Sequence, residues 1–419
     1  MSSKNTEPSS TNSSSEQTKP KFRTKFILIV ILLANFMRGF GTNVVSIGLP
    51  NHIIILGGTL TSYGLILGIF QVFQAIFQTP TSLLSDKLGR RKLILIGMTI
   101  YIIGTILCGF ATTIPQMIIF RIIQGIGAFS SVLMSVIGDI TKGEIRKSAI
   151  SYYFFSLTSG FLFGTIFGGF FTDLLGVEGT FFLSAGLTFI SFLILFIFLP
   201  ETSPKLQTLE LNNAKSSDDL ENPNSKLSWM ERIKFMRSKG FYGGILTMVI
   251  KSGTMSGVTA YTIWVLSIDY KLSSIHLSLV IIPLIIIYTI GLLLVPKISR
   301  KVGSVRLISL SFILNFFLLG IIILNPILEI YLTITFIAYF FFGLLDPTIT
   351  NFTLNFVPTQ FRGLGTGVFQ TGLFMASALG QILIPKIGDL TNFQITYSVL
   401  AGLCLLAWVS IEILKRGNK

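Results

Sequence analysis

The stretch LLSDKLGRRK, Leu83–Lys92, places one acid and four bases between two long apolar runs. No charged residue occurs from Ser62 to Ser85, and none occurs from Leu93 to Phe120. A helix needs about 20 apolar residues to cross the hydrocarbon core of a bilayer, and each run is long enough. The stretch therefore predicts a short polar turn between two membrane-spanning helices.

The whole chain follows the same pattern. Of its 419 residues, 51% are hydrophobic and only 12% are charged, about half the charged fraction of a typical soluble protein. Unpaired backbone groups are costly in lipid, so the apolar runs are expected to be helices. The sequence predicts an all-α membrane protein with twelve spans, at residues 26–50, 62–84, 93–112, 115–137, 148–171, 180–199, 241–266, 275–295, 305–324, 329–349, 364–384 and 394–414.

The basic residues predict the orientation. All but five of the 32 Lys and Arg residues fall in the N-terminal stretch, the C-terminus and the loops of one side, which is typical of the cytoplasmic side. Lys271 and Lys386 fall on the other side. We therefore expect a multi-pass protein of the cell membrane with both termini in the cytoplasm. The net charge of +14 does not indicate nucleic-acid binding, because the bases lie between apolar spans.

One long polar stretch, residues 200–240, separates spans six and seven. We expect a disordered cytoplasmic tail at 1–24, an N-terminal six-helix bundle at 25–200, a cytoplasmic linker at 201–240 and a C-terminal six-helix bundle at 241–419. The halves repeat: KISRKVGSVR, Lys297–Arg306, follows span eight as LLSDKLGRRK follows span two.

Several motifs then carry a family resemblance. LLSDKLGRRK fits a loop signature, although Ser82 stands at its first glycine position. FRIIQGIGA in span four, GFLFGTIFGG in span five and LPET after span six fit three more, with Thr165 where the drug/proton-antiporter motif has proline. Over residues 25–415 the chain resembles the major facilitator superfamily of transporters, in its drug/proton-antiporter-like branch. The resemblance implies twelve transmembrane helices in two pseudo-symmetric bundles.

The resemblance also implies a cytoplasmic latch. In this interpretation a charge network at the inner surface forms when the inner side is closed, and Gly89 permits the tight turn. The alternative is that these bases serve topology alone. The predicted latch residues are Asp86, Gly89, Arg90, Arg91 and Arg146.

Three cations fall inside the predicted spans, where a charge is costly and is a functional hypothesis by default. Arg38 and Lys251 lie near mid-membrane in spans one and seven, which line the central cavity in this family. We expect them to attract an anionic or acceptor-rich solute, with Arg121 gating or coupling. Snorkelling or pairing with backbone carbonyls is the alternative for Arg38 and Lys251.

No carboxylate is predicted at the depth of these cations. Asp346 and Glu412 come nearest, close to the cytoplasmic ends of spans ten and twelve. This argues against a cationic substrate and against a simple carboxylate proton carrier.

Uncharged residues complete the predicted site. Gln71 and Gln74 share one face of span two, where they line the cavity or bond between helices. Gly160, Gly164 and Gly168 share one face of span five, which favours close helix packing. By resemblance the same glycines have a coupling or gating role.

The sequence thus predicts a secondary transporter that moves a small organic solute by alternating access, with efflux of an amphipathic neutral or anionic compound favoured. Uptake or facilitated transport of an organic anion or sugar-like solute, and a non-transporting sensor, are the alternatives. We expect no enzymatic activity, since no nucleophile–base or metal-ligand spacing occurs. We expect a monomer in the lipid bilayer, no nucleic acid, and no metal or cofactor beyond an ion gradient, with protons favoured as the ion.

Overall fold

The computed structural model describes residues 18–127, 129–141, 143–203, 238–324, 327–357 and 362–416, and within these it contains helices and no strand. The N-terminal half consists of α1 (Thr18–Ser46), α2 (Leu49–Ile55), α3 (Leu60–Leu88), α4 (Arg90–Gly109), α5 (Ile114–Ile126), α6 (Ser130–Ile140) and α7 (Gly143–Phe198). The C-terminal half consists of α10 (Lys239–Trp264), the short π-helix η3 (Val265–Asp269), α11 (Ser274–Val302), α12 (Ser304–Ile322), α13 (Leu328–Leu354), α14 (Arg362–Leu390) and α15 (Phe393–Arg416).

The twelve predicted spans are found. Among the described residues, 10 helical segments are long and apolar enough to cross a membrane. One of them, Ser151–Phe198, holds two spans, because Gly176 has a non-helical backbone with φ of 71° and divides α7. Span four is broken between α5 and α6, and α10 completes the set of twelve. The all-α membrane fold is confirmed.

The repeated turn has the same structure in both halves. α3 and α11 each have 29 residues, and each ends at a glycine with positive φ, 103° at Gly89 and 88° at Gly303. Each glycine donates its N–H to the carbonyl four residues earlier, at Ser85 and Ser299. Only glycine adopts this conformation without strain, so the two sequence motifs encode one turn.

Within each half, the first and fifth membrane helices pack backbone to backbone. In the N-terminal half, a Cβ atom on Gly160 of α7 would lie 2.2 Å from the carbonyl oxygen of Phe36 in α1. In the C-terminal half, a Cβ atom on Gly380 of α14 would lie 2.0 Å from the carbonyl oxygen of Gly253 in α10. Small residues allow such close approach in membrane helices.

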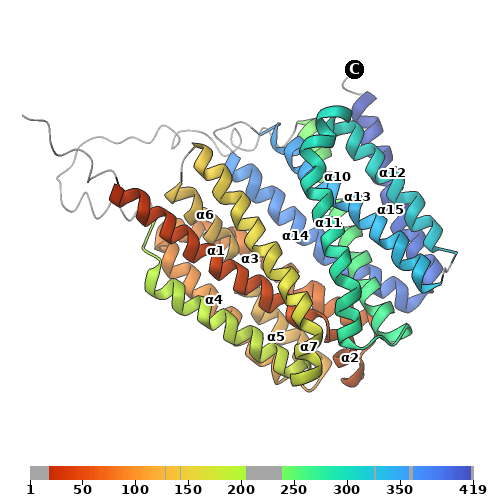
Figure 1. The fold of residues 1–419 in the computed structure, drawn as a ribbon, viewed down its shortest axis with the longest axis horizontal. Helices are drawn as coiled ribbons and strands as arrows, with labels where there is room; N and C mark the ends of the chain where they lie inside the picture. The colour runs from red at the N-terminus through yellow and green to blue at the C-terminus, as the bar shows by residue number, and fades with distance from the viewer. Residues whose placement is uncertain are drawn as a thin grey trace, which may run out of the picture.

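The two halves contact each other along α3 and α14, where the hydroxyl oxygens of Thr79 and Thr371 are 3.1 Å apart. They also form a junction at the lower end of the molecule in Figure 1, where α2 approaches η3 and α7 approaches α11. The ring centroids of Tyr63 and Trp264 are 5.5 Å apart across this junction. In the predicted orientation this is the extracellular end. Among the described residues, four hydrogen bonds between the halves lie here: from Ser267 to Asn51 (3.2 Å), from the hydroxyl and the backbone N–H of Thr61 to Asp389 (2.6 and 3.4 Å), and from the Gly169 amide to Ser278 (2.9 Å).

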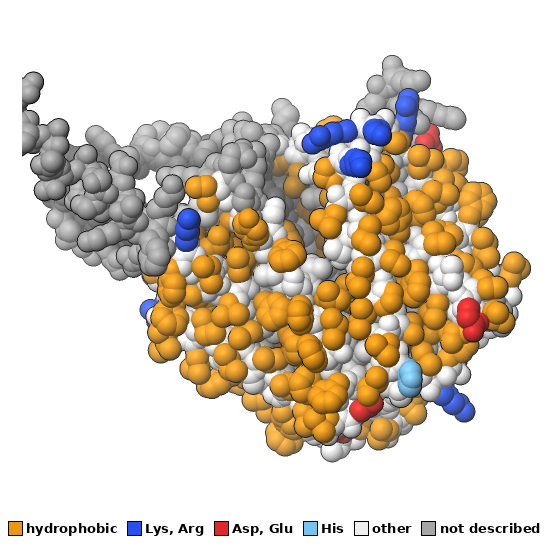
Figure 2. Space-filling view, in the orientation of Figure 1, with side chains coloured by type: hydrophobic (Ala, Val, Ile, Leu, Met, Phe, Trp, Pro, Cys, Tyr) orange, Lys and Arg blue, Asp and Glu red, His pale blue; other side chains and the backbone are white. Residues whose placement is uncertain are grey.

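The surface shows the division between lipid and water. Hydrophobic side chains cover the face in Figure 2, and basic side chains gather at the end opposite the junction of the halves. The α11–α12 turn supplies exposed bases there, Lys297, Arg300, Lys301 and Arg306. This end is the cytoplasmic one in the predicted orientation, and the location of the termini stays a prediction.

The predicted domain boundaries also stay predictions. α1 begins at Thr18, inside the predicted tail. Most of the predicted linker, residues 204–237, lies outside the described residues.

Candidate functional site

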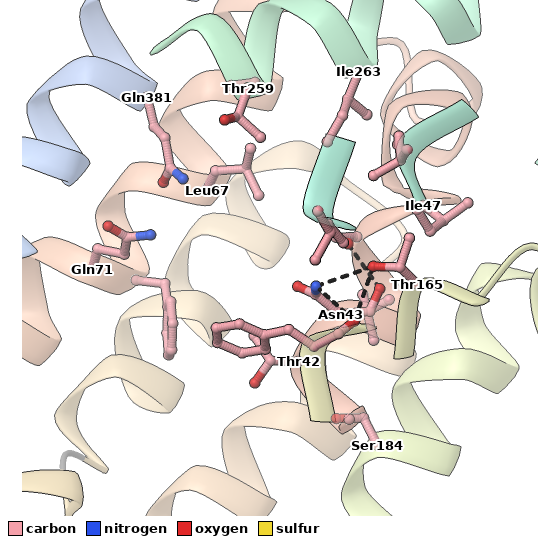
Figure 3. Close-up of a pocket in the computed structure, with 18 of the residues that line it drawn as sticks. Thr42, Asn43, Ile47, Leu67, Gln71, Thr165, Ser184, Thr259, Ile263 and Gln381 are labelled. Atoms are coloured by element: carbon pink, nitrogen blue, oxygen red, sulfur yellow. Dashed lines mark hydrogen bonds between the residues drawn. The ribbon is translucent and has the colours of Figure 1, made fainter. Parts of the chain in front are cut away.

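A cavity of about 470 Å³ lies between the two halves. α1, α3, α4, α5 and α7 line it from one half, and α10, α11, α13 and α14 line it from the other (Figure 3). Most of its exposed wall is apolar, and six serine or threonine hydroxyls and four carboxamides supply polar groups. A central cavity of this size and polarity suits a small, amphipathic organic molecule.

Arg121 is the only charged residue among the described residues that line this cavity. Its Nη1 donates a hydrogen bond to Oε1 of Gln124 at 2.9 Å, and its guanidinium carbon lies 5.1 Å from the ring centroid of Phe181. Its Nε is buried with no hydrogen-bond partner among the described residues. Arg121 therefore lines the cavity and has one guanidinium donor unused. Its role in gating or coupling stays a prediction.

Asn43 and Thr165 form a bonded pair in the cavity wall, marked by dashed lines in Figure 3. Asn43 donates to the carbonyl of Phe161 at 3.1 Å and to the hydroxyl of Thr165 at 3.2 Å. A proline at position 165, as in the antiporter motif, would remove this hydroxyl. The departure from the motif thus places a polar group in the wall.

Only one of the two predicted glutamines lines the cavity. Gln71 does, whereas Gln74 is 7% exposed and is not part of the wall. Gln381 of α14, which the sequence interpretation did not assign to the site, lines the cavity as well. Its position on a span of the second half was the only signal that the sequence offered.

Arg38 does not line the cavity in this conformation. Its Nη2 donates to Oδ1 of Asn35 at 3.2 Å, and its guanidinium carbon lies 5.8 Å from the ring centroid of Phe129. Asn35 in turn donates to the carbonyl of Tyr153 at 2.8 Å. Arg38 is thus held between helices of the N-terminal half, and its contact with solute stays a prediction.

Lys251 also lies outside the cavity wall, in a buried ion pair. Its Nζ is 2.5 Å from Oδ1 of Asp346, and its side chain is 3% exposed. The Tyr288 hydroxyl donates to the other carboxylate oxygen, and the Tyr288 ring centroid is 5.9 Å from Nζ. Since Tyr288 lines the cavity, it connects this ion pair to the solute space.

The prediction that no carboxylate lies at the depth of the embedded cations is therefore wrong for Lys251. α13 continues to Leu354, so Asp346 lies eight residues before its end instead of close to it. At about 1.5 Å per residue this places Asp346 roughly 12 Å from the end of the helix. The carboxylate largely offsets the Lys251 charge, which leaves Arg121 as the principal charge facing the cavity.

The described part of the predicted latch lies within the N-terminal half. Nε of Arg90 is 3.0 Å from Oδ2 of Asp139. The backbone N–H groups of Arg90 and Arg91 donate to the two carboxylate oxygens of Glu201, at 2.8 and 3.2 Å. A carboxylate at a helix N-terminus is favourable, so Glu201 caps α4. The sequence interpretation missed both acids, although Glu201 belongs to the LPET motif.

The side chains of Asp86 and Arg146 lie outside the described residues. The predicted charge network of Asp86 with Arg90 and Arg146, and its role as a latch, therefore stay predictions. Gly89 makes the tight turn that the sequence predicts.

The three glycines of span five pack against α1 and do not line the cavity. A Cβ atom on Gly164 would lie 2.4 Å from the carbonyl oxygen of Phe40, and one on Gly168 would lie 2.9 Å from the side chain of Ile47. Together with Gly160 they form the close-packed face of α7. Their role in coupling or gating stays a prediction.

Comparisons with known proteins agree with this architecture. An uncharacterised MFS-type transporter of Methanocaldococcus jannaschii is 22% identical over 395 residues, which cover 92% of this chain and 98% of that protein. Multidrug resistance protein 2 of Bacillus subtilis is 24% identical over 406 residues, covering 94% of this chain and 96% of that protein. A bacterial homologue of the human lysosomal transporter Spinster, solved in an inward-facing and occupied conformation, shares the fold with a TM-score of 0.75. It is 15% identical, and the match covers 94% of this chain and 97% of that one.

The family model that matches the chain is that of the Major Facilitator Superfamily, over residues 31–381. This range includes the repeated turn at Gly89 and Gly303, the Arg121 motif and the cavity helices of both halves. The chain belongs to the Major Facilitator Superfamily of membrane transporters.

Proposed function

We propose that this protein exports a small, largely apolar solute, neutral or anionic, by alternating access, and that protons move in the opposite direction. The observation that carries the proposal is the cavity between the two halves, which are hydrogen-bonded to each other at the predicted extracellular end. Similarity over nearly the full length to a multidrug resistance protein supports export as the direction.

The charge of the cavity supports a neutral or anionic solute. Arg121 contributes a cation, and no acid is among the described residues that line the wall. In a low-dielectric site a second cation beside Arg121 would be repelled, and an anion would be attracted. The apolar wall adds the burial of the solute's hydrocarbon surface.

The ion pair beneath Tyr288 supports proton coupling. In this conformation Lys251 and Asp346 largely cancel each other's charge. Protonation of Asp346 would leave a buried, unpaired ammonium, which is strongly unfavourable. The protonated protein would therefore favour a conformation in which Lys251 reaches water or solute. Through this difference between states, proton binding can do work on the conformational equilibrium.

A second candidate is facilitated transport of an organic anion without proton coupling. The single cation in the cavity favours it to the same degree. The two candidates differ in their response to an imposed pH gradient, which drives net movement only in the first.

The test uses the purified full-length protein in liposomes and three probes of one shape. These are naphthalene-2-sulfonate, naphthalene-2-carboxamide and a naphthyl quaternary ammonium ion, each measured against protein-free liposomes. We expect flux of the sulfonate and the carboxamide, increased by a pH gradient. Asp346→Asn should abolish the increase and leave solute exchange at equal pH in place.

A matched pair of tryptophan variants tests the cavity. Thr158→Trp fills the cavity wall, whereas Leu293→Trp changes a side chain that is 74% exposed on the outer face. We expect transport to be lost only in Thr158→Trp. Movement of the cationic probe alone, or flux no greater than in protein-free liposomes, would overturn the proposed function.

A further inference from the structure

Gln71 and Gln381 enter the cavity side by side from opposite halves of the protein. Figure 3 shows the two carboxamides directed into one space, Gln71 from α3 and Gln381 from α14. The helices touch beside them, since a Cβ atom on Gly68 would lie 2.7 Å from the carbonyl oxygen of Ala378. One on Gly64 would lie 2.4 Å from the carbonyl oxygen of Gln381 itself.

The sequence spacing explains this juxtaposition. Gly64, Gly68 and Gln71 follow one another at intervals of four and three residues, which places them on one face of α3. The two glycines let α14 approach, and Gln71 follows where the contact opens into the cavity. The first large polar side chain beyond the helix contact therefore faces the solute space.

Both carboxamides have an unused acceptor. The Oε1 atoms of Gln71 and Gln381 are buried and have no hydrogen-bond partner among the described residues. The neighbouring hydroxyl of Thr259 differs, because it bonds to the Tyr339 hydroxyl at 2.6 Å and to the carbonyl of Met255 at 2.8 Å. A buried acceptor without a partner is destabilising and calls for an explanation. A solute bound in the cavity would supply the missing hydrogen-bond donors and so explain both unpartnered acceptors.

The chemistry of the pair limits the solute. A carboxamide presents one acceptor and one N–H donor edge side by side, and its complement is a donor beside an acceptor. A cis-amide edge, with adjacent N–H and C=O groups, has this arrangement in lactams, cyclic imides and primary amides. The apolar side chains around the pair, among them Leu67, favour a ring system for the remainder of the molecule.

We propose that Gln71 and Gln381 form a subsite that binds the cis-amide edge of a neutral cyclic solute and bridges the two halves through it. The solute's single N–H would donate to both Oε1 atoms in a three-centre hydrogen bond, and its C=O would accept from both side-chain N–H groups. Because each half supplies one carboxamide, this full set of hydrogen bonds forms only while the halves are together. The subsite would thereby favour solute-bound closure. This inference rests on the proposed transport function and names its substrate class.

The test is equilibrium binding of tritiated 2-quinolinone, a bicyclic lactam, to the full-length protein in nanodiscs. N-methyl-2-quinolinone has nearly the same shape but lacks the N–H donor. We expect the wild type to bind the lactam about tenfold more tightly than its N-methyl derivative, the value of a well-formed hydrogen bond. Gln71→Leu and Gln381→Leu should each reduce this preference to about twofold or less.

Gln78→Leu is the matched control. Gln78 lies on the same helix, is 4% exposed and also has an unpartnered Oε1, but it does not line the cavity. We expect its preference for the lactam to equal that of the wild type. Thermal unfolding of each variant separates loss of binding from loss of the fold.

Equal binding of both lactams by the wild type would overturn the subsite and would mean that only water occupies it. The subsite would also be contradicted if Gln71→Leu and Gln381→Leu both kept the wild-type preference for the lactam over its N-methyl derivative. Flux of the naphthalene probes in liposomes distinguishes this failure from failure of transport itself. If the probes are transported but the lactam is not preferred, only the subsite is contradicted. If no probe is transported, the proposed function is contradicted.

Discussion

The two halves of this transporter place a cation at matching positions and surround it differently. Arg38 lies on the first helix of the N-terminal half and stacks on Phe129, at the break in span four. Lys251 lies on the first helix of the C-terminal half and pairs with Asp346 in span ten. The repeat thus preserves where the charge is placed, and the fourth span of each half decides whether that charge is neutralised.

The difference assigns different chemistry to the halves. No described carboxylate forms an ion pair with Arg38, so its guanidinium keeps its charge against an aromatic ring and an amide oxygen. The pair around Lys251 holds a carboxylate, a group whose charge a proton can remove. A proton can therefore change the net charge of the C-terminal site, whereas arginine stays charged at any physiological pH. Four experiments test this difference between the halves.

The largest effect is expected from separating the ion pair. Asp346→Leu leaves Lys251 as an unpaired charge at 3% exposure, and we expect a loss of about 3 kcal/mol in unfolding free energy. The double variant Asp346→Leu, Lys251→Met removes both charges and should recover most of that loss. Unfolding in mixed dodecyl maltoside and SDS micelles measures both values. Equal losses in the single and double variants would show that the pair is not coupled.

Removal of the N-terminal cation should cost less. Because no described carboxylate pairs with Arg38, Arg38→Met leaves no buried acid without its partner. We expect the unfolding free energy to fall by about 1 kcal/mol, from loss of the hydrogen bond to Asn35 and the contact with the Phe129 ring. Lys251→Met, measured in the same micelles, should lose more because Asp346 is left buried. If the two variants lose equal free energy, the contrast between the halves does not hold.

Phe129→Leu isolates the aromatic contact of Arg38. It retains an apolar side chain and removes the ring whose centroid lies 5.8 Å from the guanidinium. We expect Phe129→Leu to lower the unfolding free energy by about 1 kcal/mol in the wild-type background. The loss should be smaller in an Arg38→Met background, where the ring contact is already absent. The double-mutant cycle reports the shared part. A coupling energy near zero would make Phe129 a packing residue only.

The smallest effect is expected from lowering the pH, which acts on His52 at the junction of the halves. His52 of α2 is 2% exposed, and burial lowers its pKa below the usual value of 6.5, against the opposing effect of the nearby Glu178 carboxylate. An exposed His52 would bind a proton that the buried side chain does not bind. The closed end should therefore lose stability as pH falls from about 6.5 through the lowered pKa of the buried side chain.

Hydrogen exchange of the α2 amides measures this opening. We expect faster exchange at pH 5 than at pH 7.5 after correction for the intrinsic pH dependence, and a smaller difference in His52→Gln. If His52→Gln shows the same difference in exchange rate between pH 5 and pH 7.5 as the wild type, His52 is not the cause of that difference.

The sequence predicts the membrane architecture well because that architecture depends on local properties. Apolar run length specifies each span, and the two turn glycines repeat at matching places, so the helices and the Gly89 and Gly303 turns follow directly. Among the polar residues singled out within spans, Arg121 and Gln71 line the cavity, whereas Arg38, Lys251 and Gln74 do not. A polar residue in a span is thus a candidate for the site, and packing decides which candidates reach it.

The rest depended on contacts between distant segments. Whether Asp346 reaches Lys251 depends on how far α13 continues and on how it turns toward α10. Glu201 meets the start of α4 only because α7 returns to the basic end. Gln381 faces Gln71 only after the halves have packed. Periodicity within one segment contains none of this information.

The glycine contacts between the first and fifth helices of each half have a mechanical consequence. α1 and α7, like α10 and α14, meet without an intervening side chain that could rotate to absorb a small shift. A displacement of one helix is therefore passed on to its partner almost unchanged. Each half behaves as a stiff lever, and the change in cavity shape between states has to arise where the levers touch, along α3–α14 and α7–α11.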